Sequence, residues 1–161
     1  MAKDSDFRFA NAEDSGKILF FIKELAKYEK MENEVTGTEE QLKDWLFTRK
    51  AAEVIFALKD GKEIGFALFF HNFSTFLCRA GLYIEDLFIL PEYRGLGYGK
   101  ALLKNLAEIA VDRQCGRLEW WCLDWNKPSI DFYLSCGAKP MRDWTVFRID
   151  GNVLKEFGTR K

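Results

Sequence analysis

Apolar residues recur every three to four positions in two long stretches, which predicts amphipathic helices. The first should begin near Asn11, whose side chain can cap it, and run to about Tyr28. Its expected buried face consists of Ile18, Phe20, Phe21, Ile22 and Leu25. The second should follow Gly99, with a buried face of Leu102, Leu103, Leu106, Ile109 and Ala110. Shorter helices are expected after the capping box at 38–41 and at 128–136.

Runs of β-branched and aromatic residues predict strands at 7–10, 54–58, 64–70, 82–90 and 118–123, and a last strand or pair of strands at 141–149. Asp60-Gly61 favours a tight hairpin turn. The run at 82–90 is almost uninterrupted, as expected for a strand covered on both faces. This order of elements predicts one domain over residues 1–161 of the α/β (α+β) class, with helices on both faces of a mixed central sheet.

Composition narrows the classes of function. The 24 Lys and Arg nearly balance the 25 Asp and Glu, giving a formal net charge of -1, so no strong field favours nucleic acid or an anionic membrane as partner. The four cysteines lack CxxC spacing and the single histidine, His71, lacks a second zinc ligand nearby, so we expect no metal. The first residues lack the apolar run of a signal peptide, and no later run is long enough to span a bilayer. We expect a cytoplasmic protein.

Three alternating glycines stand in IEDLFILPEYRGLGYGK, residues 84–100. This is not a Walker A loop, which needs glycine in place of Arg94 and Ser or Thr after Lys100. It is not a dinucleotide fingerprint either, because neither Gly95 nor Gly97 begins GxGxxG. A loop of this kind between a strand and a helix can direct several N–H groups at one anion, such as a diphosphate, with Arg94 and Lys100 adding charge. Alternatively, the glycines only turn a tight corner.

Residues 94–99, RGLGYG, match the R/Q-x-x-G-x-G/A signature of the GNAT superfamily of N-acetyltransferases. Three longer stretches resemble the spermidine/spermine and thialysine acetyltransferases in order and spacing: FIKELAKYEKMENEV (21–35), YIEDLFILPEYRGLGYG (83–99) and LDWNKPSIDFYLSCGA (123–138). The resemblance covers most of the chain. It implies a GNAT fold, acetyl-coenzyme A as co-substrate, a small primary amine as acceptor, and a homodimer.

The resemblance assigns the coenzyme contacts to three segments. The central strand would bind the acetyl carbonyl and pantetheine through backbone groups of Leu87, Phe88 and Ile89. The loop would cradle the pyrophosphate with Arg94, Gly95, Leu96, Gly97, Tyr98, Gly99 and Lys100. The downstream segment would contribute Asn126, Lys127, Pro128, Ser129 and Tyr133.

Acetyl transfer to an amine needs a base, because alkylammonium groups have a pKa of about 10.4. Glu85 and Asp86 lie in the apolar strand, where neighbouring side chains point to opposite faces and burial would raise a carboxyl pKa. The resemblance implies that Glu85 contacts the amine and that Tyr133 protonates the leaving thiolate. Alternatively, the carboxylates pair with arginines such as Arg79 or Arg142, and Tyr133 packs in the core.

The resemblance also implies contacts to the acceptor. Relatives bind the cationic amine just after the first helix, which points to Tyr28 and Glu29, whereas Glu32 and Glu34 are equally well explained as solvated charges. The thialysine branch is matched by Ser74, Thr75, Leu123 and Asp124. In that branch such residues engage the polar end of an amino acid, and an aspartate can pair with an α-amino group.

The identity of the amine stays open between a polyamine, a diamine and a thialysine-like amino acid. Glu119 stands where the polyamine branch carries a histidine, which departs from that pattern. Peptide or protein N-acetylation uses the same motif and is an alternative. A non-catalytic module that binds acyl-coenzyme A is another, although the presence of both Glu85 and Tyr133 argues against it.

Overall fold

The computed structural model of the protein describes residues 7–160. Residues 1–6, where the sequence predicts no signal peptide, lie outside this range, as does Lys161. The chain forms two compact units, one ending at Trp121 and the other beginning at Cys122. Within the described residues, the first unit contains the whole sheet.

Five strands form one mixed sheet in the order β1-β2-β3-β4-β5. They are β1 (Phe7–Phe9), β2 (Glu53–Lys59), β3 (Lys62–Ser74), β4 (Arg79–Ile89) and β5 (Leu118–Trp120). The first four pair antiparallel, and β5 runs parallel to β4. The predicted hairpin at Asp60-Gly61 is confirmed, because both residues have positive φ, 50° and 76°, as a tight two-residue turn requires.

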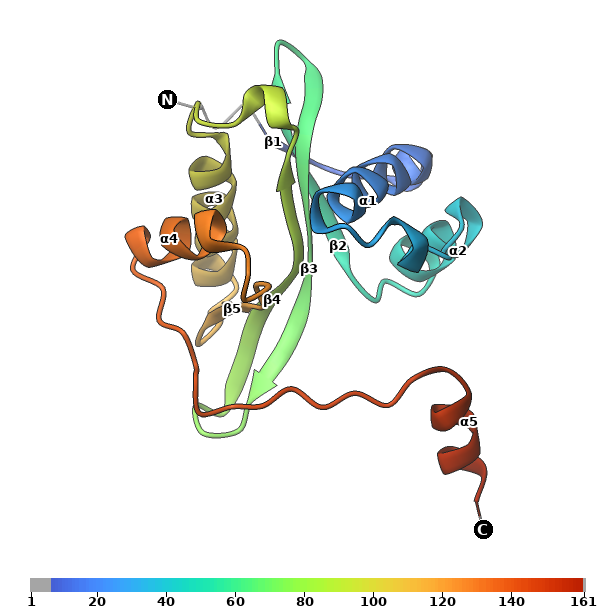
Figure 1. Cartoon of the computed structure of the whole chain (residues 1–161). Coiled ribbons are helices and arrows are strands. Elements are labelled where there is room, and N and C mark those ends of the chain that lie inside the picture. The colour runs from blue at the N-terminus through green and yellow to red at the C-terminus, as the bar shows by residue number, and fades with distance from the viewer. Residues whose placement is uncertain (1–6, 161) are drawn as a thin grey trace. The chain divides into compact units, whose positions relative to one another are not determined.

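Helices cover both faces of this sheet, as predicted. They are α1 (Ser15–Glu29), α2 (Glu39–Lys43), which continues as a π-helical turn (Asp44–Thr48), and α3 (Tyr98–Asp112). α1 and α2 lie on one face and α3 lies on the other (Figure 1). Asn11 caps a short 3-10 turn that leads into α1, and Thr38 and Gln41 form the predicted capping box at α2.

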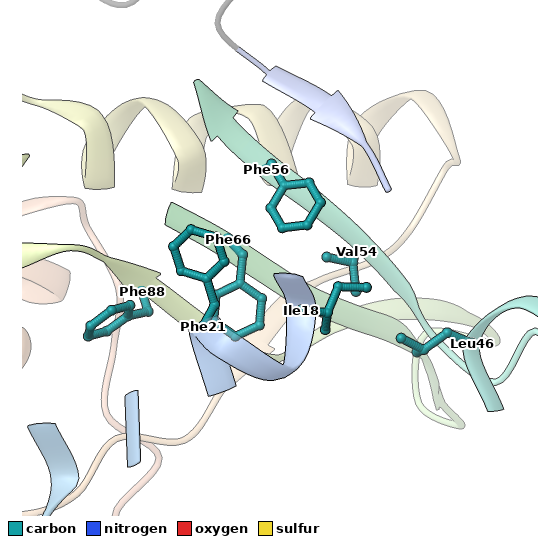
Figure 2. Close-up of a cluster of buried hydrophobic side chains, with 7 residues drawn as sticks. All are labelled: Ile18, Phe21, Leu46, Val54, Phe56, Phe66 and Phe88. Carbon is teal, nitrogen blue, oxygen red and sulfur yellow. The ribbon is translucent and has the colours of Figure 1, made fainter. Parts of the chain in front are cut away.

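The α1 face of the sheet is filled by a buried apolar cluster (Figure 2), made of Ile18, Phe21, Leu46, Val54, Phe56, Phe66 and Phe88. Phe21 reaches from α1 to the rings of Phe56 and Phe66, with ring centroids 5.8 and 5.5 Å apart. The prediction that Phe20 is buried is wrong, because this side chain is 48% exposed. One helical residue turns the side chain by about 100°, which takes Phe20 off the buried stripe.

The second unit departs most from the sequence prediction. Its first helix, α4 (Lys127–Ser135), with Asn126 as its N-cap, lies within one residue of the predicted helix at 128–136. The predicted strand or strands at 141–149 are wrong, because residues 138–150 form neither strand nor helix. A strand exists only beside a partner, and this segment has none within the described residues. A helix that sequence analysis missed, α5 (Gly151–Thr159), follows it.

The helices of the described residues include none that is long and apolar enough to cross a membrane.

A charge network ties β1 and the start of α1 to β3. Arg8 donates to both carboxylate oxygens of Asp14 at 2.8 Å, and it also pairs with Glu63, which in turn pairs with Lys17. The hydrogen bond from Arg8 is the main reason that the pKa of Asp14 is lowered. Burial alone would raise the pKa of Glu63, but hydrogen bonds from Lys17 and Arg8 outweigh it and lower the pKa to about 2.

The network should make the protein less stable in acid. Both carboxyl groups have lower pKa values in the folded protein than in the unfolded chain, where they are about 3.9 and 4.3. Their stabilisation is therefore complete above about pH 5 and is lost as the pH falls through the folded values, towards about 2 for Glu63. Glu63→Gln should lower the free energy of unfolding at pH 7 by about 1–3 kcal/mol.

Urea denaturation between about pH 7 and about pH 3 measures this effect. The decline should be shallower for Glu63→Gln than for the natural protein, whereas the control Glu108→Gln, which removes an exposed pair with Lys104, should decline like the natural protein. Equal slopes for all three proteins would contradict the assignment.

Candidate active site

β4 carries one extra residue opposite β3. In the register of the two strands, Asp86 pairs with Leu68 and Ile84 pairs with Phe69, so Glu85 is left over as a β-bulge. A bulge bends its strand and increases the local twist. The pairing with β5 ends at the same place, because β5 accompanies β4 only as far as Ile84. From the bulge onward, β4 has no strand partner on the side of β5 within the described residues, and we call this side its open edge.

The open edge of β4 presents backbone groups of Leu87 and Ile89. The Leu90 N–H donates to the Ile64 carbonyl of β3 at 2.9 Å. Because the direction of hydrogen bonding alternates along an antiparallel strand, Leu87 and Ile89 direct their N–H groups away from β3, and Phe88 directs its N–H toward β3. A ligand lying along this edge would therefore meet the N–H groups of Leu87 and Ile89.

The glycine loop that follows β4 has two residues in the left-handed region, Gly95 with φ 73° and Gly97 with φ 89°. A side chain is strained there. Gly97 is the N-cap of α3, no side chain caps this helix, and its first turn contains no acidic residue. The N-terminal N–H groups of α3 are thus suited to an anion. Gly99 differs, because its φ is not positive and an added Cβ would meet only Ile89, at 4.0 Å.

Two carboxylates, Glu85 and Glu29, act on a third, Asp86, where α1 ends beside β4. Asp86 is half-buried, and burial, followed by the negative charges of Glu85 and Glu29, raises its pKa to about 7. Burial also raises the pKa of Glu29, the last residue of α1. The ion pairs of the described residues include neither Glu85 nor Asp86, so the alternative of pairing with Arg79 is not found. Asp86 can therefore exchange a proton near neutral pH.

Tyr28 is predicted to bind the substrate and Arg94 is predicted to bind the coenzyme, and their side chains are in contact. The Arg94 guanidinium stacks on the Tyr28 ring at 4.6 Å and on the Phe88 ring at 5.1 Å from their centroids. Leu96 and Lys100 are exposed on the loop and the first turn of α3, and Tyr98 begins that helix.

Ser74 and Thr75 lie at the far end of the β3–β4 hairpin. Ser74 pairs with Arg79, six residues along β4 from Glu85, which is about 20 Å at the rise of a strand. Ser74 is buried, and its hydroxyl accepts a hydrogen bond from the Leu77 N–H at 3.3 Å. Within one chain, these two residues are therefore not brought to the carboxylates.

The remaining predicted residues, Leu123, Asp124, Asn126, Lys127, Pro128, Ser129 and Tyr133, belong to the second unit. The Asn126 N–H donates to the Leu123 carbonyl at 2.9 Å, and the Asn126 side chain accepts from the Ser129 N–H and caps α4. Asp124 is exposed, and Tyr133 is half-buried. The contacts of these residues with coenzyme and substrate stay predictions.

Residues 19–138 match the acetyltransferase (GNAT) family, a span that includes parts of both units. The chain belongs to the GNAT family. It is an acetyltransferase, and GNAT acetyltransferases use acetyl-coenzyme A.

Relatives of this GNAT acetyltransferase act on amines. It is 35% identical over 161 residues to a thialysine N-epsilon-acetyltransferase of Bos taurus, covering 92% of this chain and 94% of the relative. Over 98 residues it is 43% identical to an L-ornithine N5-acetyltransferase of Arabidopsis thaliana, covering 61% and 43%. A solved structure of an integron cassette protein from the mobile metagenome of V. cholerae matches it with a TM-score of 0.80 and 27% identity, covering 96% and 97%.

The first unit of this GNAT acetyltransferase fits acetyl-coenzyme A at two places. The uncapped start of α3, with Gly95 and Gly97 before it, suits the diphosphate. The open edge of β4 suits the extended pantetheine, whose amides can bond to a strand edge. The bound coenzyme supplies an acetyl thioester, and the chain's own part is to hold and orient it.

Sequence analysis did not assign Asp86 a role. A signal was present, because strand alternation puts Asp86 on the same face as the apolar Phe88, two residues later. What the sequence could not show is that the fold would partly bury Asp86 and bring the charge of Glu29, at the end of α1, close enough to act on it.

Gly97 has a positive φ and Gly99 does not, so we predict different effects when each is replaced by alanine. Gly97→Ala should destabilise the coenzyme-free protein by about 1–2 kcal/mol, because alanine is strained in the left-handed region. Gly99→Ala should leave that stability nearly unchanged, because its Cβ has room. If the coenzyme approaches the loop backbone closely, Gly99→Ala should still weaken coenzyme binding, and more than Lys100→Ala does.

Thermal unfolding of the coenzyme-free variants and calorimetric titration with coenzyme A measure the two effects separately. Equal losses of coenzyme affinity for Gly99→Ala and Lys100→Ala would argue against a backbone cradle.

Proposed function

We propose that this protein transfers the acetyl group of acetyl-coenzyme A to the terminal amine of a small basic amino acid or diamine, by direct attack in a ternary complex. The observation that carries the proposal is the half-buried Asp86 carboxyl group beside Glu85 and Glu29, with its pKa raised to about 7. Carboxylates attract a cationic amine, and a group with this pKa can take its proton at neutral pH.

The proposed reaction gives each predicted residue a separate role. Asp86 accepts a proton from the ammonium group, directly or through water, while Glu85 keeps its expected contact with the amine. The amine nitrogen then bonds to the carbonyl carbon as the carbon–sulfur bond breaks. One backbone N–H of the β4 edge, that of Leu87, donates to the carbonyl oxygen as it gains charge, and the N–H of Ile89, about 7 Å along the strand, is left for a pantetheine amide. Tyr133, assigned by the resemblance, gives its hydroxyl proton to the thiolate, and its phenolate then regains a proton from the nitrogen, directly or through water, as the nitrogen becomes an amide.

The acceptor class is supported by the printed names of relatives. Thialysine and ornithine are both amino acids with a terminal amine, and the acetyltransferases named for them match this chain. Glu29 at the end of α1 would bind the cationic amine together with Tyr28, and Asp124 would pair with the α-amino group.

We propose a homodimer as well. Ser74 and Thr75 lie about 20 Å from Glu85 in one chain at the rise of a strand, so their predicted contact with the acceptor requires a neighbouring copy. Sedimentation analysis tests this, and a monomer at concentrations that support turnover would contradict it.

Thiol release from acetyl-coenzyme A tests the function. Thialysine, ornithine, lysine, putrescine, spermidine and a peptide with a free N-terminus would be compared at equal concentration. The proposal expects turnover with at least one of the amino acids or diamines and little with the peptide. A preference for the peptide would support N-terminal acetylation, and coenzyme binding without turnover on any amine would support the non-catalytic alternative.

The base assignment predicts a specific pH profile. The rate should rise with pH through about 7, because Asp86 must be ionised to accept a proton. Asp86→Asn should lower kcat/KM by about a hundredfold or more and remove this limb of the profile. Glu85→Gln should move the limb to lower pH, because removing a neighbouring negative charge lets Asp86 ionise more easily.

Steady-state kinetics between about pH 5.5 and about pH 9 measures these profiles. If Glu85→Gln, and not Asp86→Asn, abolished the limb, Glu85 would be the base.

A further inference from the structure

Arg94 is placed between the coenzyme loop and the acceptor carboxylates. Its Nε donates to the Ile89 carbonyl at 2.9 Å, at the end of β4. Its guanidinium lies over the rings of Tyr28 and Phe88, 4.6 and 5.1 Å from their centroids. The two rings also pack on each other, with centroids 6.5 Å apart. We name these three side chains, Arg94, Tyr28 and Phe88, the Arg94 stack.

Each member of the Arg94 stack adjoins a different part of the site. Tyr28 precedes Glu29 at the end of α1, and Phe88 lies two residues beyond Asp86 on the same face of β4. Arg94 itself is followed at once by Gly95, the first residue of the loop in the left-handed region. The stack therefore joins α1, β4 and the loop at one point.

We propose that Arg94 is a positioning residue, which holds the end of α1 against β4 and so sets the placement of Glu29 beside Asp86. The planar guanidinium is the part of the side chain that does this, since it can stack on two rings while its Nε donates in the same plane. A lysine would keep the charge and lose that geometry. The alternative is that Arg94 serves as a counter-charge for the diphosphate, a role in which lysine would suffice.

The proposal has a consequence for binding, and this part rests on the proposed function. Because the stack includes the residue that begins the loop, a ligand that orders the loop also orders the end of α1. The affinities for coenzyme and amine are then coupled through Arg94, and by linkage each ligand raises the affinity for the other by the same factor.

The first experiment uses the coenzyme-free protein and needs no activity. The carboxyl titration of Asp86 is followed by NMR in the natural protein, in Arg94→Lys and in a control, Arg49→Lys. Arg49 stacks on Trp45 at 4.5 Å and donates its Nε to Asp44, so it matches Arg94 in kind but lies just after the π-helical turn that follows α2. Thermal unfolding checks that all three proteins fold.

The proposal expects the pKa of Asp86 to fall by about half a unit or more in Arg94→Lys, because Glu29 moves away and burial decreases. Arg49→Lys should leave it unchanged. This fall cannot come from the charge of Arg94, because lysine keeps that charge. Losing a nearby cation would in any case raise the pKa of Asp86 and not lower it. An unchanged titration in a folded Arg94→Lys protein would overturn the proposal.

The second experiment separates the two roles of Arg94 by affinity. Arg94→Lys should raise the amine KM about three- to fivefold, the size expected for losing an exposed cation–π contact, and change the Kd of coenzyme A less than about twofold. Tyr28→Leu should raise the amine KM by at least as much, because Tyr28 is also proposed to contact the amine, and the double variant should be no worse than Tyr28→Leu alone. Arg94→Gln tests the charge alone.

Two outcomes would overturn the proposal. In the first, Arg94→Lys has the kinetics of the natural protein and only Arg94→Gln loses coenzyme affinity, which would show that Arg94 is a counter-charge for the diphosphate. In the second, the effects of Arg94→Lys and Tyr28→Leu are additive. If the natural protein acetylated no amine, the proposed function would fail, and the titration of Asp86 would still decide the role of Arg94.

Discussion

The organisation of the site depends on one constraint, the single extra residue that β4 carries opposite β3. Because Glu85 has no partner on β3, β4 must bend there, and its pairing with β5 stops at Ile84. A straight strand would continue to pair with β5, and the N–H groups of Leu87 and Ile89 would be used inside the sheet. The bulge therefore releases the backbone donors that a coenzyme can use, and it does so beside the carboxylates that an amine can use.

Two carboxylates of the same sheet show how partners decide the behaviour of a buried charge. Glu63 on β3 is paired with Arg8 and Lys17, and its pKa falls to about 2. Asp86 on β4 has carboxylates as its charged neighbours, and its pKa rises to about 7. The first arrangement stabilises the fold, and the second costs stability in exchange for a group that titrates near neutral pH.

The glycine loop combines two different demands on a small residue. Gly95 and Gly97 are needed for the backbone conformation of the loop, since their φ values of 73° and 89° are strained for residues with a side chain. Gly99 satisfies no such demand within the protein, because there is room for a Cβ. Contacts within the described residues therefore do not explain its small size, and its part in coenzyme binding stays a prediction.

The sequence by itself determined the elements that depend on neighbours along the chain. The capping box at Thr38 and the turn at Asp60-Gly61 are local, and each formed where it was predicted, as did the buried stripe of α1 apart from the exposed Phe20. The glycine motif likewise gave the family. The tertiary structure decided what depends on distant neighbours: the absence of a strand at 141–149, the bulge at Glu85, and the burial of Asp86 near Glu29. Strand pairing and the burial of a charge are set by residues far away in sequence, which the local pattern cannot specify.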